Sequence, residues 1–441
     1  MKILQISSGD FFSIYGGGQV YVKNIVDEII RQDFDVVVLS FVAKDISIVQ
    51  CEYKGISIWE IGRRATSADI EDLVRTISPS VIHAHSQKAL FTTLGERLHI
   101  PVIVTAHHGG ILCPAGTLMN ADDQICQTIV SHEHCLRCSL ANIRTGRSWY
   151  PMMRIIPKNG YLRLGRALQK LPFIPFLTPI GSTALSIQNK ITEWQTISDK
   201  ATTIIAPSHA IADAMCRNGL SRDKVTLIAH GIPKNEEIQN DCPSKLGGRA
   251  HAEGVSNLAH NDKIRFFYVG RICRIKGLHV LLEAFSGLAD ANKAELHIIG
   301  GAGNKGEQQY MEQLQRKYIS SNIVWHGKVA PSEVFATIKD FDVMVHPTIC
   351  LEVFGLNIAE SLAMNKPVLA TCCGGAEMQI EDGVNGWLVA PNNVATLREK
   401  MNEIVEKGYT LDVCNLNKDI ITIDNHVEDL VKVYETETFV D

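Results

Sequence analysis

Short apolar runs recur along this chain with helical segments between them, and they fall into two sets. Apolar runs of this length are typical of strands buried on both faces of a parallel sheet. The first set of predicted strands covers residues 3–6, 36–39, 81–84, 102–105, 203–206 and 225–229, and the second covers 265–269, 295–299, 323–326, 343–345 and 368–370. We therefore expect an α/β protein of two doubly wound domains that face each other across a cleft.

A polar stretch separates the two sets. Residues 234–262 contain several Asn and show no hydrophobic period, which is typical of a linker or surface loop. The predicted organisation is an N-terminal domain over 1–233 with a cysteine-containing basic insertion at 113–192, the linker at 234–262, a C-terminal domain over 263–423, and a helix over 424–441 that returns to the N-terminal domain. A chain of 441 residues is long enough for two such domains.

Charge and cysteine content exclude several classes of protein. The net charge of −5 gives no overall field that would attract nucleic acid. The first residues read as a short strand and polar turn rather than a secretory signal, and the apolar stretch 171–187 is too short and too broken by proline to span a bilayer. Twelve cysteines without an export signal indicate a reducing compartment. We expect a cytoplasmic protein.

Two glutamates eight positions apart carry the strongest functional signal. The predicted strand 343–345 leads through a loop containing Glu352 into a predicted helix over 356–364 that contains Glu360. Both carboxylates would lie at the carboxyl end of a parallel strand, where open α/β sheets bind ligands. Ionised carboxylates are strong acceptors for the O–H groups of a hydroxyl-rich ligand. The pair alone also fits a solvated loop acid and a helix-start acid favoured by the dipole.

A basic turn opens the second set of strands. Arg271, Arg274 and Lys276 follow the strand 265–269 and lead into a predicted helix over 278–285. Cations beside the N–H groups at a helix start can hold a diphosphate without a metal ion. The alternative is a solvated basic turn, because runs of charge are usually surface features.

A glycine-rich turn follows the first strand. Gly16, Gly17 and Gly18 precede an apolar helix and would let backbone N–H groups approach a ligand closely. The run lacks the spacing of a dinucleotide fingerprint and the Lys-Ser/Thr of a P-loop. A plain tight turn is the alternative interpretation.

Taken together, these motifs resemble the retaining GT-B glycosyltransferases of family 4, the glycosyltransferase group 1 type. The resemblance covers most of the chain and is most specific in the second domain. There the E-x7-E pair, the Gly-Arg…Lys-Gly turn and the run of Gly374, Gly375, Glu377, Gly383, Asn385 and Gly386 occur in the expected order. The resemblance implies a GT-B fold with two Rossmann-like domains.

For the second domain, the resemblance implies residues that hold a nucleotide-sugar donor. Arg271 and Lys276 match the pair that binds the diphosphate, Glu360 matches the ribose-binding glutamate, and Glu352 matches the glutamate that contacts the donor sugar. Further positions that match donor-binding backbone are Phe354, Gly355, Leu356, Lys328 and Val329.

For the first domain, the resemblance implies four residues. Gly17 and Gly18 match the glycine loop that approaches the phosphate, His107 matches a histidine that lines the sugar, and Ser208 matches a serine at the cleft. The choice of His107 over its neighbour His108 rests on spacing alone.

The reaction implied by the resemblance is transfer of a sugar from a nucleotide-diphosphate sugar to an acceptor hydroxyl with retention. Without an Asp-x-Asp motif beside the basic turn, we expect no required cofactor and no dependence on a divalent ion. A glycosidase would also use two carboxylates, but it would have no use for a diphosphate-binding turn. A GT-B nucleotide-sugar epimerase and a non-catalytic nucleotide-sugar-binding protein remain as alternatives.

Residues 139–192 are strongly basic and interleaved with aromatic residues. The segment has eight Lys and Arg and no Asp or Glu, in a protein whose net charge is −5. This composition suits an anionic membrane surface. We expect peripheral attachment to the inner face of the membrane and a lipid-linked or cell-envelope glycan as acceptor, in polysaccharide or lipopolysaccharide biosynthesis. The alternative is a basic surface that binds nothing.

Four cysteines precede this basic segment. Cys135 and Cys138 have metal-ligand spacing, whereas Cys113 and Cys126 lie at distances that match no standard zinc finger. A structural zinc site and a set of ordinary reduced thiols are the two interpretations.

Overall fold

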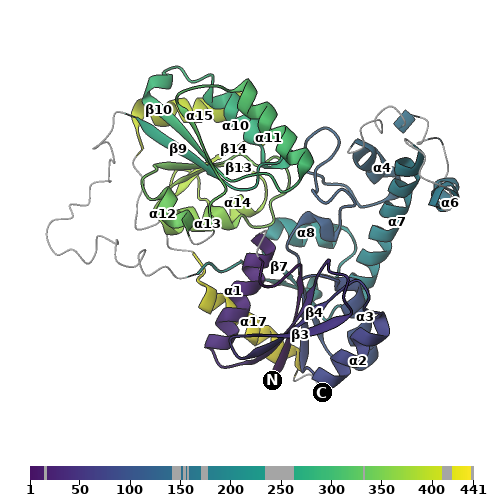
Figure 1. Ribbon diagram of the computed structural model, residues 1–441. Coiled ribbons are helices and arrows are strands. Elements are labelled where there is room, and N and C mark those ends of the chain that lie inside the picture. The colour runs from purple at the N-terminus through teal and green to yellow at the C-terminus, as the bar shows by residue number, and fades with distance from the viewer. Residues whose placement is uncertain are drawn as a thin grey trace. The chain divides into compact units, whose positions relative to one another are not determined.

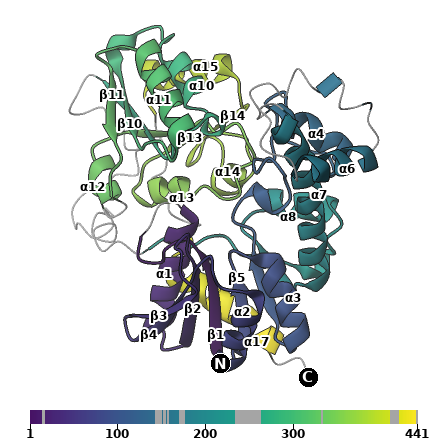
Figure 2. The ribbon, with the colours of Figure 1, turned by 45° about the vertical axis from the view of Figure 1, so that its right-hand side comes forward.

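The computed structural model describes residues 1–13, 17–141, 150–151, 155, 158–169, 177–233, 263–330, 333–409 and 420–438. The chain forms two compact units (Figures 1 and 2). Unit 1 comprises Met1–Ala121, Gln127–Pro233 and Ile421–Asp441, and unit 2 comprises Asp122–Cys126 and Lys234–Ile420. The predicted linker at 234–262 lies outside the described residues.

Unit 1 contains an eight-stranded sheet in the order β3-β4-β2-β1-β5-β6-β7-β8. Its strands are β1 (Lys2–Ser8), β2 (Asp35–Phe41), β3 (Ile48–Tyr53), β4 (Ile56–Ile61), β5 (Val81–Ala84), β6 (Val102–Thr105), β7 (Thr203–Ala206) and β8 (Val225–Leu227). All neighbours pair in parallel except the β3–β4 hairpin at one edge. The order reverses between β1 and β5, so the carboxyl ends of these two strands flank a topological switch point.

Most helices of unit 1 pack near its sheet, two of them pack mainly against another helix, and the last comes from the end of the chain. They are α1 (Gly17–Arg31), α2 (Ser67–Ile77), α3 (Lys88–Leu98), α4 (His132–Ala141), α6 (Lys158–Gln169), α7 (Leu177–Lys200), α8 (His209–Arg217) and α17 (Ile423–Thr438). Helix α17, yellow in Figure 1, packs against α1 through Val427, Leu430 and Tyr434, which join the core that contains Tyr21 and Ile25.

Unit 2 contains a six-stranded parallel sheet in the order β11-β10-β9-β12-β13-β14. Its strands are β9 (Ile264–Val269), β10 (Ala294–Ile299), β11 (Ile323–Gly327), β12 (Val343–His346), β13 (Val368–Thr371) and β14 (Gly386–Val389). Its helices are α10 (Leu278–Phe285), α11 (Lys305–Lys317), α12 (Val334–Ile338), α13 (Leu356–Ala363), α14 (Gly375–Gln379) and α15 (Val394–Lys407). The switch point lies between β9 and β12. Two doubly wound parallel sheets confirm the predicted α/β fold class.

The division of the chain differs from the sequence analysis in two places: residues 421–423 belong to unit 1 rather than to the C-terminal domain, and one short segment of the predicted insertion belongs to unit 2. Asp122–Cys126 belongs to unit 2, although its place in the sequence assigned it to the insertion of the N-terminal domain. The reason is a set of contacts that sequence order does not indicate. Asp123 forms an ion pair with Arg274, and Ile125 packs against the core cluster that contains Phe267.

Among the helices of the described residues, none combines the length and the apolar character that a membrane crossing would require.

Candidate active site

Most of the predicted donor-binding residues of unit 2 lie where β9 and β12 end. These neighbouring parallel strands run into two loops that contact each other through their backbones, because the Ile349 N–H donates to the Ile275 carbonyl at 3.0 Å. Gly277 lies between the loops with a positive φ of 70°, and a Cβ there would lie 1.7 Å from the Pro347 carbonyl oxygen. Only glycine fits this conformation and this spacing, so Gly277 is needed for the two loops to approach each other.

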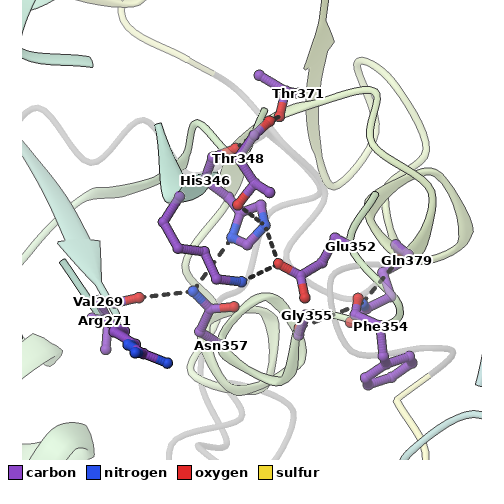
Figure 3. Close-up of polar contacts among 12 residues, drawn as sticks. Val269, Arg271, His346, Thr348, Glu352, Phe354, Gly355, Asn357, Thr371 and Gln379 are labelled. Carbon is purple, nitrogen blue, oxygen red and sulfur yellow. Dashed lines mark hydrogen bonds and ion pairs between the residues drawn. The ribbon is translucent and has the colours of Figure 1, made fainter. Parts of the chain in front are cut away.

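Lys276 and Glu352 form an ion pair at this position (Figure 3). Their side chains are 29% and 15% exposed. Burial opposes ionisation of both groups, but the Lys276 ammonium lowers the pKa of Glu352 well below its ordinary value, and the Glu352 carboxylate raises the pKa of Lys276. Each ion therefore keeps the other charged, and the site contains a fixed carboxylate and a fixed ammonium.

His346, the last residue of β12, also contacts Glu352 (Figure 3). Its Nε2 lies 3.0 Å from Thr348 Oγ1 and 3.5 Å from Glu352 Oε2, and its Nδ1 lies 3.3 Å from the side-chain amide nitrogen of Asn357. Because an amide nitrogen only donates, Nδ1 is the acceptor and Nε2 carries the hydrogen. Burial lowers the pKa of His346, although Glu352 opposes the shift. A neutral His346 thus donates from Nε2 to Thr348 Oγ1, and the Glu352 carboxylate lies beside this bond at 3.5 Å.

Asn357 connects the start of α13 to the end of β9. Its side-chain nitrogen donates to the Val269 carbonyl at 2.8 Å, which holds the helix start beside the strand that leads to Arg271 (Figure 3). Leu356 is the first residue of α13, and Gly355 precedes it with a φ of 87°. The left-handed conformation at Gly355 turns the loop into the helix, so the N–H groups of the first turn are presented at this end of the sheet.

A side chain of α14 holds the backbone of the loop that precedes α13. The Gln379 side-chain nitrogen donates to the Phe354 carbonyl at 2.5 Å and more weakly to the Gly355 carbonyl at 3.5 Å (Figure 3). Phe354 itself is buried. These bonds fix the backbone of Phe354 and Gly355, the positions predicted to seat sugar and phosphate.

Glu360 lies in the second turn of α13 as a half-buried carboxyl group. Within the part of the chain that the structure describes, no hydrogen bond or ion pair reaches this carboxyl. Burial raises the pKa of Glu360 to about 7. An acceptor that is partly desolvated and has no protein partner is suited to hydroxyl groups of a ligand.

Arg271 is paired to an acid that the sequence analysis did not identify. Its guanidinium contacts both carboxylate oxygens of Glu307 at 2.7 and 2.8 Å, and its side chain is 57% exposed. Glu307 also accepts from the Gly303 N–H at 2.8 Å. Lys328 is exposed after β11, and Val329 packs against the core of unit 2.

The predicted residues of unit 1 lie at the carboxyl ends of its strands or at helix starts. Gly17 and Gly18 are exposed at the start of α1, and a Cβ at Gly18 would meet nothing within 4 Å. Ser208 is wholly buried at the N-cap of α8, and its hydroxyl has no hydrogen-bond partner among the described residues. The glycines thus leave room at the helix start, whereas Ser208 presents a desolvated hydroxyl.

The two adjacent histidines after β6 have different environments. His107 is half-buried and its Nε2 lies 2.8 Å from His85 Nδ1. His108 is exposed, and its Nδ1 accepts from the Gly110 N–H at 3.0 Å as the cap of a short turn. His108 therefore has a local structural role, and His107 is linked to the interior of unit 1.

Sequence reasoning missed the side chains that orient the predicted residues. His346, Asn357 and Glu307 contact them only after the strands have been aligned, and no spacing in the sequence indicates these contacts. A signal did exist for His346, since it is a polar residue at the exit of a buried strand. The same signal marks His85, which follows β5.

The four cysteines considered as metal ligands are divided between the two units. Cys126 lies in unit 2, whereas Cys113, Cys135 and Cys138 lie in unit 1. Among the described residues, no group of three or more His, Cys, Asp or Glu is arranged to hold a metal ion. The zinc site stays a prediction for elemental analysis of protein purified without chelators.

Several known proteins are similar to this chain in sequence. The model of the family described as Glycosyl transferases group 1 matches residues 253–421. An uncharacterized glycosyltransferase of Methanocaldococcus jannaschii is 24% identical over 247 residues, which cover 54% of this chain and 59% of that protein. The O-antigen chain mannosyltransferase C of Escherichia coli is 25% identical over 223 residues, which cover 49% of this chain and 55% of that protein. The chain thus spans little more than half the length of these curated relatives.

Solved structures match over nearly the whole chain. HepE of Anabaena, crystallised in complex with UDP and glucose, has a TM-score of 0.63 at 16% identity, with 99% of this chain and 100% of that chain covered. Sucrose-phosphate synthase from Thermosynechococcus elongatus has a TM-score of 0.65 at 16% identity, with 99% of each chain covered. At this identity the likeness shows the fold. The chain has the GT-B fold, and its residues 253–421 match the Glycosyl transferases group 1 domain.

Proposed function

We propose that this protein is a glycosyltransferase that moves a sugar from a nucleotide-diphosphate sugar to an acceptor hydroxyl. The observation that carries the proposal is the array at the ends of β9 and β12: the Lys276–Glu352 ion pair, the exposed Arg271, and the Glu360 carboxyl, which has no partner among the described residues. Cations and hydroxyl acceptors are the groups that a nucleotide sugar requires. The match to a group 1 glycosyl transferase domain and the UDP and glucose bound to HepE support the same conclusion.

The chemistry follows from the charges. As the bond between the sugar C1 and the diphosphate oxygen breaks, the leaving diphosphate gains negative charge, which Arg271 and Lys276 would stabilise. A cation about 4 Å from such a charge contributes roughly 4 kcal/mol at an effective dielectric near 20. Glu352 would accept hydrogen bonds from hydroxyl groups of the transferred sugar, and Glu360 would accept hydrogen bonds from the ribose hydroxyls of the nucleotide.

Two fixed cations make a metal ion unnecessary for charge neutralisation in this proposal. We therefore expect turnover to be unchanged by EDTA and by added Mg²⁺. A matched assay with a metal-dependent glycosyltransferase shows that the chelator is effective. Loss of turnover in EDTA that Mg²⁺ or Mn²⁺ restores would contradict this part of the proposal.

The direct test is incubation with UDP-, GDP- and ADP-sugars and measurement of nucleoside diphosphate release in the presence of acceptor. A thermal-shift screen selects the donor first, since ligand at 100 times its Kd stabilises by about 2.7 kcal/mol. Isomerised donor with the nucleotide intact would identify an epimerase. A thermal shift without turnover on any acceptor would identify a binding protein, and cleavage of aryl glycosides would identify a glycosidase.

The finer features of the reaction belong to the same proposal. We propose retention at the anomeric carbon, which the anomeric configuration of the product tests. As acceptor we propose a lipid-linked or cell-envelope glycan, supported by the basic segment 139–192 and by the name of the O-antigen chain mannosyltransferase relative.

A further inference from the structure

Histidines gather at the carboxyl edge of the sheet in unit 1. The cluster, called here the histidine cluster, comprises His83, His85, His107, His230 and His426, with the ring of Tyr21 packed against four of them. Of these five histidines, the sequence analysis predicted a functional role only for His107. Buried imidazoles in contact must have their hydrogens arranged without conflict, so the tautomer of each member depends on the tautomers of its neighbours.

The inner partner of His107 determines which of its nitrogens carries a hydrogen. His85 Nε2 lies 2.7 Å from the side-chain oxygen of Gln5, which can only accept, so Nε2 of His85 carries the hydrogen. In neutral His85 the other nitrogen, Nδ1, is then an acceptor, and it lies 2.8 Å from His107 Nε2. His107 must therefore donate from Nε2, which leaves Nδ1 as a lone pair. Within the described residues, His107 Nδ1 has no partner.

In the structure the Gln5 amide directs its oxygen to His85 and its nitrogen to Tyr434. Its nitrogen donates to Tyr434 Oη at 3.2 Å, and Tyr434 lies 2.6 Å from His83 Nδ1. The single hydroxyl hydrogen of Tyr434 goes to His83 Nδ1, so His83 donates from Nε2 to Thr105 Oγ1 at 2.7 Å. All of these bonds would reverse together if the amide were turned over, and His107 would then carry its hydrogen on Nδ1.

A backbone carbonyl fixes the direction of a second bond in the histidine cluster. His426 Nδ1 lies 2.8 Å from the Ala229 carbonyl, which only accepts, so His426 accepts at Nε2 from the Tyr21 hydroxyl at 2.8 Å. The hydroxyl hydrogen of Tyr21 is thereby used within the cluster.

Burial favours the neutral form of the imidazoles in the histidine cluster. Burial lowers the pKa of His107 and His85 well below the ordinary histidine value, and the Lys88 ammonium adds to the shift at His107. Burial also lowers the pKa of His83 to about 3 and that of His426 to about 4. The tautomer argument, which requires neutral rings, therefore applies at physiological pH.

We propose that Gln5 and His85 are positioning residues that hold His107 in its Nε2–H form, so that Nδ1 accepts a hydrogen bond from a hydroxyl group of a carbohydrate ligand. The hydrogen-bond chain is independent of any activity, whereas the identity of the ligand rests on the proposed function. The lone pair accepts a hydroxyl hydrogen and finds no donor in a fluoro or O-methyl substituent at the same position. His107 is thereby a determinant of which sugars bind.

Nitrogen NMR of histidine tests the tautomer without any ligand. In ¹⁵N-histidine-labelled protein, long-range ¹H–¹⁵N spectra distinguish the two neutral tautomers, and the signals absent from His107→Asn identify His107. We expect the Nε2–H form in the wild type and a mixture of tautomers in Gln5→Met. Leu4→Met is the matched control, because Leu4 is equally buried on the same strand and makes no bond to the cluster. An Nδ1–H form in the wild type, or an unchanged spectrum in Gln5→Met, would overturn the proposal.

A binding experiment then tests the ligand. Loss of one neutral hydrogen bond corresponds to roughly a three- to tenfold loss of affinity. We expect Gln5→Met to lose this much affinity for a UDP-, GDP- or ADP-sugar while its affinity for the free nucleoside diphosphate stays the same, and Leu4→Met to keep both. Equal losses for both ligands would overturn the role of His107 toward the sugar. If the wild type binds no nucleotide sugar, the proposed function fails, and the NMR result still decides the tautomer.

Discussion

Lys276 and Glu352 keep each other ionised at the end of β12, so a change to either residue acts on both. The basic turn and the spaced glutamates indicated these two residues and also Arg271 and Glu360. Their placement at neighbouring strand ends follows from the parallel topology. The contacts of His346 and Asn357 could not be predicted, because they depend on side-chain directions at the ends of β9 and β12 and at the start of α13.

Lys276→Met tests the Lys276–Glu352 ion pair. The change removes a cation predicted to stabilise the leaving diphosphate, and we expect turnover to fall by about 10²–10³. It also leaves Glu352 without its counter-ion. We expect the free energy of unfolding to fall by on the order of 1–3 kcal/mol, less than for a fully buried pair because the lysine side chain is 29% exposed. Steady-state kinetics and urea unfolding measure the two effects.

The double variant Lys276→Met/Glu352→Gln separates these effects. With no uncompensated charge it should recover most of the stability but none of the turnover. Arg271→Ala is a second comparison, since its exposed pair with Glu307 contributes about 0–1 kcal/mol and its loss should lower turnover with little effect on unfolding. Near-native turnover in either single variant would contradict the diphosphate assignment.

The raised pKa of Glu360 predicts a pH-dependent affinity for the donor. A carboxyl with a pKa of about 7 is mostly protonated at pH 6 and mostly ionised at pH 8, whereas an ordinary glutamate is ionised at both. If the ionised form accepts the ribose hydroxyls, donor affinity should rise about tenfold over this range. Calorimetric titration with a nucleotide sugar measures the change. Glu360→Gln should show a flat profile, and an equally steep profile in this variant would assign the titration to another group.

The raised pKa of Glu360 also makes the stability of the ligand-free protein depend on pH, in the direction opposite to that of donor affinity. Because the folded state binds the Glu360 proton more tightly than the unfolded state, the stabilising contribution is complete below the ordinary glutamate pKa and is lost as pH rises through about 7. Donor binding and stability without donor therefore respond to pH in opposite directions at this residue.

At the scale of elements, the apolar runs predicted the central strands, and the structure confirms them within a few residues. The strands β3, β4 and β14 were missed. The β3–β4 hairpin lies at the edge of its sheet and is partly exposed, so it lacks the continuous apolar run that marks a strand buried on both faces. Strand β14 is also an edge strand, and it begins at Gly386 within a run of turn residues.

Helix α17 illustrates an element whose amphipathic pattern is visible but whose partner is not. Leu430 is wholly buried against the core of unit 1, and we expect Leu430→Ala to lower the free energy of unfolding of unit 1 by about 2–5 kcal/mol. Hydrogen exchange of α1 and β1 reports the loss within this unit. Glu435→Ala, on the exposed face of the same helix, should leave exchange unchanged. Equal protection in Leu430→Ala and the wild type would show that α17 contributes little to this core.

At the scale of the whole molecule, sequence alone predicted the two parallel sheets, because the alternation of strands and helices persists on both sides of the polar stretch. It did not assign Asp122–Cys126 to unit 2. The Arg274–Asp123 ion pair and the packing of Ile125 join segments far apart in the chain, and no local pattern encodes them.

The distribution of charge over the whole chain predicts binding to anionic membranes. Residues 139–192 carry eight cations and no acid in a protein with a net charge of −5. Each cation near an anionic surface contributes about 1 kcal/mol. We expect flotation with vesicles that contain phosphatidylserine or phosphatidylglycerol, and no flotation with phosphatidylcholine alone. Binding should weaken as salt rises, because the Debye length falls from about 10 Å at 0.1 M to about 3 Å at 1 M.

Charge reversal locates the binding surface. Arg163 and Arg166 are exposed on α6, and Arg163→Glu/Arg166→Glu changes the local charge by four units without touching Leu162 or Leu168, which are buried. This variant should lose flotation. Arg316→Glu on α11, whose side chain is 81% exposed in unit 2, reverses a charge outside the segment and should float like the wild type. Equal loss in both variants would indicate a response to net charge alone, and wild-type protein that ignores anionic vesicles would leave the basic segment without a role at the membrane.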